Sequence, residues 1–222
     1  MTWMLTPTGA EYHLSGAEAM TDAGRPVHIE DVAHQLALIN RFHGATSRPY
    51  SVAEHSLLCC DIAARLGRSV HVQMAALWHD AHECVTQDVS SPAKRAVNAV
   101  ACAGGGISAW TLFEATHAKR FRRALGLETV FVTARAALHH IDLTALATER
   151  RDLTAYDPTL NQPWAVLHDD DPAERIEPIT WVRLDSPERA AMTWQDWRQA
   201  FLDRFHTLQH AMQQPQGQGG MA

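Results

Sequence analysis

The sequence predicts an all-α fold, a helical bundle with one small β-hairpin near the N-terminus. Apolar residues recur every three or four positions through most of the chain, which is the period of an amphipathic helix, whereas the alternation typical of strands is sparse. The 222 residues suffice for one compact domain with a sizeable core. We expect residues 1–210 to form this domain and the polar, Gly-rich residues 211–222 to be a flexible tail.

Helices are expected wherever the apolar period is sustained over several turns. Gly67 and Gly126 each follow such a segment, at the position where helices commonly end. The predicted helical segments are Ile29–Ile39, Val52–Leu66, Val72–Glu83, Trp110–Leu125, Leu138–Ala145 and Trp194–Leu208.

The remaining segments indicate hairpin, strand or loop. Residues 4–14 contain Pro7 and Gly9 between short flanks, which favours a small hairpin. Residues 179–184 alternate enough for a short strand, and residues 156–187 as a whole are rich in Pro and Asp and are expected to be mostly irregular. The glycine-rich stretch 103–106 follows no strand and has no Gly-Lys-Ser/Thr, so a phosphate-binding P-loop is not indicated.

Composition narrows the class of protein. The formal net charge of −6 argues against broad or stable nucleic-acid binding, which favours basic surfaces. No apolar run reaches the roughly 18–20 residues that cross a bilayer, and the first twenty residues do not resemble a secretory signal. The four cysteines form no Cys-x-x-Cys pair. We therefore expect a cytoplasmic protein without a membrane partner; a homo-oligomer is compatible with the sequence.

The strongest chemical signal is the pair His79-Asp80 at the end of an apolar helix. An isolated pair of this kind is usually a hydrogen-bonded core histidine. Glu83, however, follows at helical spacing, so a continuous helix would place all three on one face, and Asp88 comes soon after.

Two further ligand types lie on inward-facing stripes of other predicted helices. His55 stands between Val52 and Leu58, and Asp142 is flanked by Leu138 and Ile141. Helices of a bundle can bring such groups to one metal ion. Mixed imidazole and carboxylate ligation favours one divalent transition metal, Mn²⁺, Co²⁺, Zn²⁺ or Fe²⁺, and four protein ligands leave room for water and substrate on an octahedral ion.

In combination, these motifs resemble the HD-domain metal-dependent phosphohydrolases. Within that family the sequence is most similar to bacterial 5′-deoxynucleotidases and related phage deoxynucleotide phosphohydrolases, over about residues 29–150. The matching stretches are Leu38-Ile39-Asn40-Arg41-Phe42, Ser51-Val52-Ala53-Glu54-His55-Ser56, Trp78-His79-Asp80-Ala81-His82-Glu83-Cys84, Asp88-Val89-Ser90-Ser91-Pro92-Ala93-Lys94, and Asp142.

The resemblance implies roles for particular residues. The metal ligands would be His55, His79, Asp80 and Asp142. Glu83 would position or deprotonate the attacking water, and Asp88 would assist near the leaving group. Arg41 would grip the substrate phosphate, as the fork of a guanidinium can, and Lys94 would make a phosphate or structural contact.

Two features depart from the deoxynucleotidases. They carry tryptophan where this chain has Phe42, at the position that helps to select deoxyribose, so discrimination against ribose is open. Residues 152–209 match them poorly and look more like phage and prophage relatives, which leaves the number of substrate phosphates open.

Simpler interpretations stand beside these roles. Arg41 could cap a helix C-terminus, Glu83 could orient a metal ligand, and Asp88 could be an N-cap. His82 is expected to point away from the site, and His139 and His140 to lie on the surface. The basic cluster Lys119, Arg120, Arg122 and Arg123 is interpreted mainly as a solvated face, and the stripe Trp194, Trp197, Phe201 and Phe205 as core.

The expected function is metal-dependent removal of the phosphate from deoxynucleoside 5′-monophosphates. A deoxynucleoside triphosphate triphosphohydrolase is the close alternative. A non-catalytic nucleotide sensor and a di-iron oxygenase of the HD type are the alternatives from other classes; the oxygenase needs additional ligands that the sequence does not obviously offer.

Overall fold

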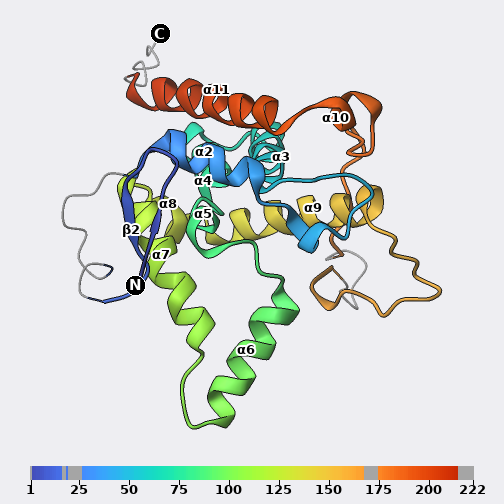
Figure 1. The fold of residues 1–222 in the computed structure, drawn as a ribbon. Coiled ribbons are helices and arrows are strands. Elements are labelled where there is room, and N and C mark those ends of the chain that lie inside the picture. Colours follow the sequence, from blue (N-terminus) through green and yellow to red (C-terminus); the bar gives the residue numbers. More distant parts are fainter. Residues whose placement is uncertain (1, 17–18, 20–26, 168–174, 215–222) are drawn as a thin grey trace.

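The computed structural model describes residues 2–16, 19, 27–167 and 175–214, and it confirms an all-α fold with an N-terminal hairpin (Figure 1). Along the chain the elements are β1 Trp3–Leu5, β2 Glu11–His13, α2 Ile29–Leu38, η1 Arg41–Gly44, α3 Val52–Arg65, α4 Val70–Trp78, α5 Glu83–Thr86, α6 Ser91–Ala103, α7 Ala109–Ala124, α8 Glu128–Thr133, α9 Arg135–Leu153, η2 Ala165–Leu167, α10 Pro187–Ala191 and α11 Trp194–Gln213.

Local sequence explains where the central helices begin. The Ser51 hydroxyl accepts a hydrogen bond from the Glu54 backbone N–H at the start of α3, and Ser69 caps α4 in the same way. Thr193 and Asp196 form a reciprocal capping box at the start of α11. These caps fix the ends of the helices that build the core.

The hairpin is antiparallel, with Trp3 opposite His13. Thr8 at its turn donates from its backbone N–H and its hydroxyl to the two carboxylate oxygens of Asp31, at 2.8 and 2.7 Å. This contact ties the hairpin to α2.

The core has α3 and α4 at its centre. Helix α11 packs across α2, α3 and α4 (Figure 1). Three members of its predicted core stripe, Trp197, Phe201 and Phe205, are buried as expected. The prediction is wrong for Trp194 at the start of the helix, which is exposed and packs edge-on against His34. On the other side α9 packs on α3 and α4, which brings Asp142 next to the ends of those helices.

The predicted helix over residues 72–83 is wrong in one respect: it is not continuous. Helix α4 ends at Trp78, and residues 79–82 form a tight turn before α5 begins at Glu83. In this turn the N–H groups of Ala81 and Glu83 bond to the carbonyls of Trp78 and Asp80, three residues earlier. Asp80 and Glu83 therefore remain neighbours although they do not share an α-helix.

The predicted strand over residues 179–184 is also wrong, since the segment has no strand partner among the described residues. Its backbone is instead bound by side chains. Arg151 donates to the carbonyl of Ile179, Arg48 donates to the carbonyl of Leu184, and the Leu184 N–H donates to Asp152. The rest of residues 156–187 is irregular as expected, apart from the short turn η2.

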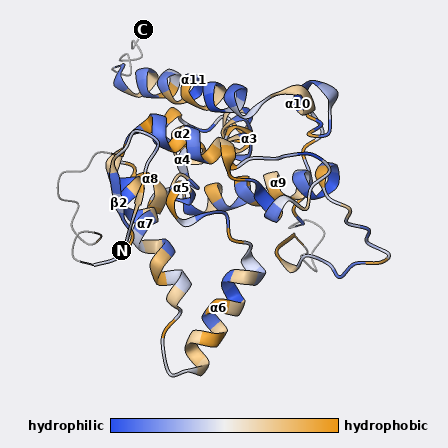
Figure 2. Cartoon of the chain, in the orientation of Figure 1, coloured by the Kyte–Doolittle hydropathy of each residue, from blue (hydrophilic) through white to orange (hydrophobic). Residues whose placement is uncertain are grey.

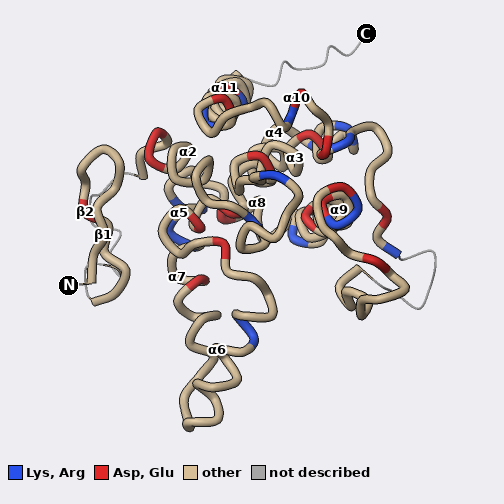
Figure 3. The backbone as a smooth tube through the Cα atoms, turned by 45° about the vertical axis from the view of Figure 1, so that its right-hand side comes forward, with Lys and Arg blue, Asp and Glu red and all other residues tan. Residues whose placement is uncertain are grey.

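Helices α6, α8 and α10 were not predicted, and α5 extends beyond the predicted end at Glu83. Helices α6 and α7 form a hairpin that projects from the body, on the side away from α11 (Figure 1). No side chain of α6 is buried, and apolar residues lie along the projection (Figure 2). Its far end carries no Lys, Arg, Asp or Glu, because residues 96–113 contain none (Figure 3). The apolar residues Ala93, Val97, Val100 and Ala101 recur at helical spacing, so the sequence did carry the pattern of this helix.

At the C-terminus α11 extends to Gln213, so residues 211–213 of the predicted tail are helical. The remainder from residue 215 lies outside the described residues. Within the described part of the chain, no helix is both long and apolar enough to cross a membrane.

Candidate metal centre

His55 occupies the first turns of α3 and is fully buried. Its Nδ1 lies 2.5 Å from Oε1 of Glu149, a buried carboxylate on α9. Because a carboxylate can only accept, Nδ1 carries the proton, and in the neutral imidazole Nε2 is left with a free lone pair. This is the tautomer that binds a metal through Nε2.

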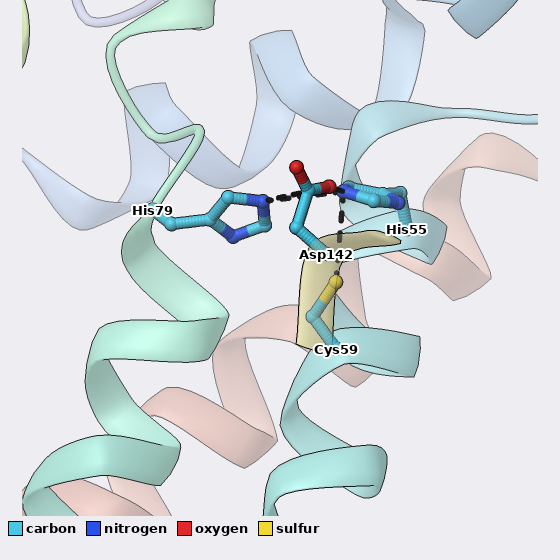
Figure 4. Close-up of side chains that lie close together, drawn as sticks. All are labelled: His55, Cys59, His79 and Asp142. Atoms are coloured by element: carbon cyan, nitrogen blue, oxygen red, sulfur yellow. Dashed lines mark hydrogen bonds and ion pairs between the residues drawn. The ribbon is translucent and has the colours of Figure 1, made fainter. Parts of the chain in front are cut away.

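His79 follows α4 and is oriented in the same manner. Its Nδ1 donates to the backbone carbonyl of Ala76 at 2.8 Å, which again leaves Nε2 as the acceptor. The two Nε2 atoms lie 3.2 Å apart, and Figure 4 shows both rings directed at the carboxylate of Asp142.

Two carboxylates complete the convergence. Oδ1 of Asp142 lies 3.3 Å from Nε2 of His55 and 3.8 Å from Nε2 of His79. Oδ2 of Asp80 lies 3.5 and 3.2 Å from the same two atoms. Nitrogen and oxygen ligands bound at 2.0–2.2 Å to one ion are separated from their neighbours by about 2.9–3.6 Å. The structure thus brings the four predicted ligands together at distances that suit a single metal ion.

The electrostatics of this cluster favour positive charge at its centre. Burial alone would raise the pKa of the Asp142 carboxyl, but hydrogen bonds from His55 and His79 hold it well below its usual range. Burial lowers the pKa of His79, yet Asp80 and Asp142 raise it well above its usual value. Converging lone pairs and carboxylates need either protons or a cation between them.

Cys59 lies at the same point and was not recognised in the sequence as a site residue. It stands one helical turn after His55, fully buried, with its sulfur 3.6 Å from Nε2 of His55 (Figure 4). Ligand atoms of His55, Cys59, His79 and Asp142 all lie within 4.8 Å of one another, so this group could hold a metal ion. A sulfur at 2.3 Å and a nitrogen at 2.05 Å from a tetrahedral ion are about 3.6 Å apart, which agrees with the observed contact.

Asp80 is not part of that group of four, although its oxygen is as near to the imidazoles as that of Asp142. Asp80 is nevertheless a candidate ligand, because its Oδ2 lies 3.5 and 3.2 Å from the Nε2 atoms of His55 and His79. Asp80 and Cys59 are thus alternative candidates for the fourth ligand of the ion. They differ in chemistry, since a carboxylate is a hard ligand and a thiolate a soft one.

Arg41 and Glu149 surround the ligands. The α2 helix ends at Leu38, and the Arg41 guanidinium reaches instead to Asp80, at 3.5 Å, and to Glu149, at 3.3 Å. The C-cap interpretation of Arg41 is therefore wrong. Glu149 also accepts from the Tyr50 hydroxyl at 2.9 Å. Glu149 was missed, although it stands seven residues after Asp142, two turns along the same helix.

Glu83 and Asp88 stand beside the centre as carboxyls with raised pKa. Burial, followed by the charges of Asp80 and Asp88, raises the pKa of Glu83 well above its usual value. Its Oε2 is buried and has no hydrogen-bond partner in the described chain. Burial also raises the pKa of Asp88, against the opposing charge of Arg41. The N-cap of α6 is Ser90, so the N-cap interpretation of Asp88 is wrong.

The centre opens into a cleft of about 1390 Å³ between α7, α8 and the start of α9. His79, Asp80, Glu83 and Asp142 line one end. Lys94 also lines it, in an ion pair with Glu114. His82, expected to point away, faces this cleft, but its nearest ionic neighbour is Glu114 at 3.6 Å rather than a metal ligand. His139, expected on the surface, is exposed at the cleft wall.

The ring of Phe42 lies beside the Arg41 guanidinium, 5.6 Å from ring centre to Cζ, and Phe42 is not among the residues that line the cleft. Its backbone has φ 55°, a left-handed conformation that is uncommon outside glycine. Its half-buried ring packs beside Trp164, with ring centres 6.1 Å apart.

The chain is similar in sequence to two proteins that are both described as uncharacterized. No protein-family model matches the chain. It is 34% identical over 139 residues to the uncharacterized protein YfdR of Escherichia coli K12, a match that covers 63% of this chain and 66% of that protein. It is 44% identical over 75 residues to an uncharacterized protein of Rhodobacter capsulatus, covering 32% of this chain and 38% of that protein. The chain thus spans less than two thirds of either relative.

Proposed function

We propose that this protein is a metal-dependent phosphohydrolase that removes the 5′-phosphate of deoxynucleotides, with deoxynucleoside 5′-monophosphates as its preferred substrates. The observation that carries the proposal is the convergence of His55, His79, Asp80 and Asp142 beside a buried carboxyl, Glu83, at one end of an open cleft. A structural zinc site is closed, whereas this one opens to solvent, as a catalytic centre requires.

The side chains of His55, His79, Asp80 and Asp142 would hold the ion. When bound, the ion supplies Lewis-acid polarisation of a phosphoryl oxygen and lowers the pKa of a coordinated water. Glu149 and the Ala76 carbonyl fix the two imidazoles in the required tautomer, so the protein reaches ligand geometry before the ion arrives.

Glu83 is the proposed base. Its raised pKa makes its carboxylate a stronger proton acceptor than an exposed glutamate, and its unpartnered Oε2 is free to accept from water. In the balanced reaction the water oxygen bonds to phosphorus, the bond from phosphorus to the 5′ oxygen breaks, and that oxygen gains a proton. Asp88, whose pKa is also raised, is the proposed source of the proton for the leaving group.

Arg41 is the proposed phosphate contact. Its guanidinium is buried, and its distances of 3.5 and 3.3 Å to Asp80 and Glu149 are long for charged hydrogen bonds, which leaves it able to donate to a phosphate oxygen. Phe42 beside it has no polar group, so any preference for deoxyribose would be steric. Lys94 would act through the cleft, where Glu114 now holds it.

The test is a panel of deoxy- and ribonucleoside monophosphates with Mn²⁺, Co²⁺ or Zn²⁺, with the released phosphate measured. We expect turnover that a chelator abolishes and that added metal restores. Glu83→Ala should retain metal and nucleotide binding but lose roughly 10²- to 10⁴-fold in rate, the usual contribution of a general base. Nucleotide binding without turnover under every metal would instead support a non-catalytic nucleotide sensor.

A further inference from the structure

A pocket of about 280 Å³ lies between the N-terminal hairpin and the helices α2, α5 and α7 (Figure 1). We call it the hairpin pocket. Its floor consists of buried apolar side chains, whereas its rim consists of polar side chains that are exposed or half-buried. The floor is formed by Tyr12, Val32, Cys84, Val85 and Phe121, and the rim includes Thr6, Glu11, His28, Gln35 and Arg120.

The hairpin pocket is separate from the metal centre. Among the described residues, none lines both the pocket and the cleft. The two meet at α5, where Glu83 lines the cleft and the next two residues, Cys84 and Val85, line the pocket. A ligand in the pocket would therefore touch the short helix that carries Glu83 without reaching the metal ligands.

The basic cluster of α7, interpreted in the sequence mainly as a solvated face, is divided among three surroundings. Lys119 and Arg122 line the cleft. Arg123 pairs with Glu128 on the surface. Arg120 lines the hairpin pocket, so this cation belongs to a hollow that the metal centre does not use.

The hairpin pocket holds charged groups of both signs. The Arg120 guanidinium lies 4.4 Å from the centre of the Tyr12 ring and forms no ion pair with any described residue. The Asp31 carboxylate also lines the pocket, with its two oxygens accepting from Thr8, and Glu11 on the rim adds a second carboxylate. An anionic ligand would meet these two carboxylates, and a cationic ligand would meet Arg120. Since like charges in contact are costly, the lining favours an uncharged ligand.

Two rim side chains can bind a polar group of such a ligand. Gln35 on α2 is half-buried, and its side-chain amide makes no hydrogen bond to any described residue. An amide offers one acceptor and two N–H donors, and the guanidinium of Arg120 offers donors only. An amide or carbonyl group on the ligand would match both, because its oxygen can accept from either residue.

The volume of the hairpin pocket sets the size of the ligand. An apolar cavity of about 150 Å³ is large enough to bind benzene. At about 280 Å³, the pocket has room for one six-membered ring with a short polar extension, or about ten non-hydrogen atoms. Its apolar floor suits the ring, since burial of apolar surface on both sides is favourable.

We propose that the hairpin pocket is a second ligand site, which binds a small uncharged molecule with an apolar body and one amide or carbonyl group. The body would lie on Val32, Val85 and Phe121, and the polar group would meet Gln35 and Arg120 at the rim. The site stands apart from the metal centre and does not rest on the function proposed above.

The experiment titrates the full chain with three probes that share one ring and differ in charge: phenylacetamide is neutral, phenylacetate is an anion and 2-phenylethylamine is a cation. Binding is followed by the backbone amide NMR signals, with attention to Cys84, Val85 and Phe121. The variants are Ala10→Phe, which fills the pocket from the hairpin, and Arg120→Leu, which removes the cation. Arg95→Leu is the matched control, because Arg95 is exposed on α6 and lines neither the pocket nor the cleft. Circular dichroism checks that each variant is folded.

We expect phenylacetamide to bind with a Kd on the order of a millimolar, the usual scale for a ligand of this size, and to shift the signals of the pocket residues. The two charged probes should bind several-fold more weakly. In Arg120→Leu the carboxylates of Asp31 and Glu11 remain, so the amine should gain several-fold relative to phenylacetamide. Ala10→Phe should weaken binding of phenylacetamide at least about 10-fold, and Arg95→Leu should match the wild type.

Tightest binding of a charged probe to the wild type would overturn the proposed class of ligand. Binding of no probe, shifts confined to residues outside the pocket, or an unchanged Kd in both Ala10→Phe and Arg120→Leu would overturn the site itself. No turnover is measured, so each of these results is independent of whether the protein hydrolyses nucleotides.

Discussion

The Nε2 atoms of His55 and His79 lie 3.2 Å apart, although each ring already uses its Nδ1 proton elsewhere. In their neutral forms the two rings would therefore point lone pairs at each other, and the carboxylates of Asp80 and Asp142 add only acceptors. A cation at this point resolves the repulsion, and the predictions below follow from that arrangement.

Glu149 should control metal affinity without touching the ion. Glu149→Gln removes the charge that holds the Nδ1 proton of His55, so we expect metal affinity to fall about 10- to 100-fold, as is usual for loss of a partner of a ligating histidine. Calorimetric titration with Zn²⁺ measures this. The control is Asp61→Asn on α3, the helix that carries His55, which loses only the part-buried pair with Arg204. Equal affinities in the two variants would contradict the role of Glu149.

Cys59 should contribute a soft ligand. In the Co²⁺-loaded protein we expect a thiolate-to-cobalt charge-transfer band that is lost in Cys59→Ser, together with weaker Zn²⁺ binding, because thiolate favours Zn²⁺ and Co²⁺ over Mn²⁺. Cys60→Ser is the control, since Cys60 is equally buried but its sulfur contacts Arg204. A spectrum without the band in wild type, or with the band in Cys59→Ser, would exclude Cys59 as a ligand.

Metal binding should release protons. Burial and Arg41 lower the pKa of His55, but nearby negative groups, including Glu149 and Asp142, raise it well above its usual value, and that of His79 is raised as well. The metal-free imidazoles thus keep their protons at neutral pH, and the ion must displace them. Affinity should rise with pH until these raised values are passed. Calorimetry in buffers of different ionisation enthalpy counts the protons, and zero release would contradict this charge state.

The same linkage sets the pH dependence of the metal-free fold. Because the folded pKa values of His55 and His79 are raised, their stabilisation is complete below the unfolded value of about 6.5 and is lost as pH rises through the folded values. Added metal replaces the protons, so the increase in Tm that it causes should be larger at higher pH. A metal-induced increase that shrinks as pH rises would run against this sign.

Phe42 should influence the choice of sugar if the nucleoside lies against it. Phe42→Trp should sharpen the preference for deoxyribose, and Phe42→Ala should admit ribonucleotides, because the contact is steric. The measurement is kcat/KM for paired deoxy- and ribonucleotides. A deoxy-to-ribo ratio that is the same in wild type and both variants would place Phe42 away from the sugar, with its packing on Trp164 as its only role.

Periodicity predicted the helices that carry the ligands because their inner faces are buried. It failed where burial is weak or the backbone changes. The stretch of α6 is amphipathic but exposed, so its pattern was present and not used, and the turn at residues 79–82 directly follows an apolar run that ends at Trp78. The strand expected at residues 179–184 failed because Arg48, Arg151 and Asp152, distant in sequence, satisfy its backbone.

The structure brings the four predicted ligands together, but the sequence pattern indicates only some of the residues that surround them. Glu149 and Cys59 stand at helical spacing from Asp142 and His55, so a search along the same helix faces would have found both. The presence of several basic residues along one cleft could be found only from the structure. Lys119 and Arg122 face Arg135 only because α7 and the start of α9 line one cleft, and no local pattern encodes that arrangement.

The most direct test of the central claim is elemental analysis of the purified protein together with His79→Ala and Glu83→Ala. We predict about one transition-metal ion per chain in wild type and in Glu83→Ala, and little or none in His79→Ala, because His79 is a proposed ligand and Glu83 is not. Full metal content in His79→Ala, or none in wild type after exposure to Mn²⁺, Co²⁺, Zn²⁺ and Fe²⁺, would contradict a metal centre at His55, His79, Asp80 and Asp142.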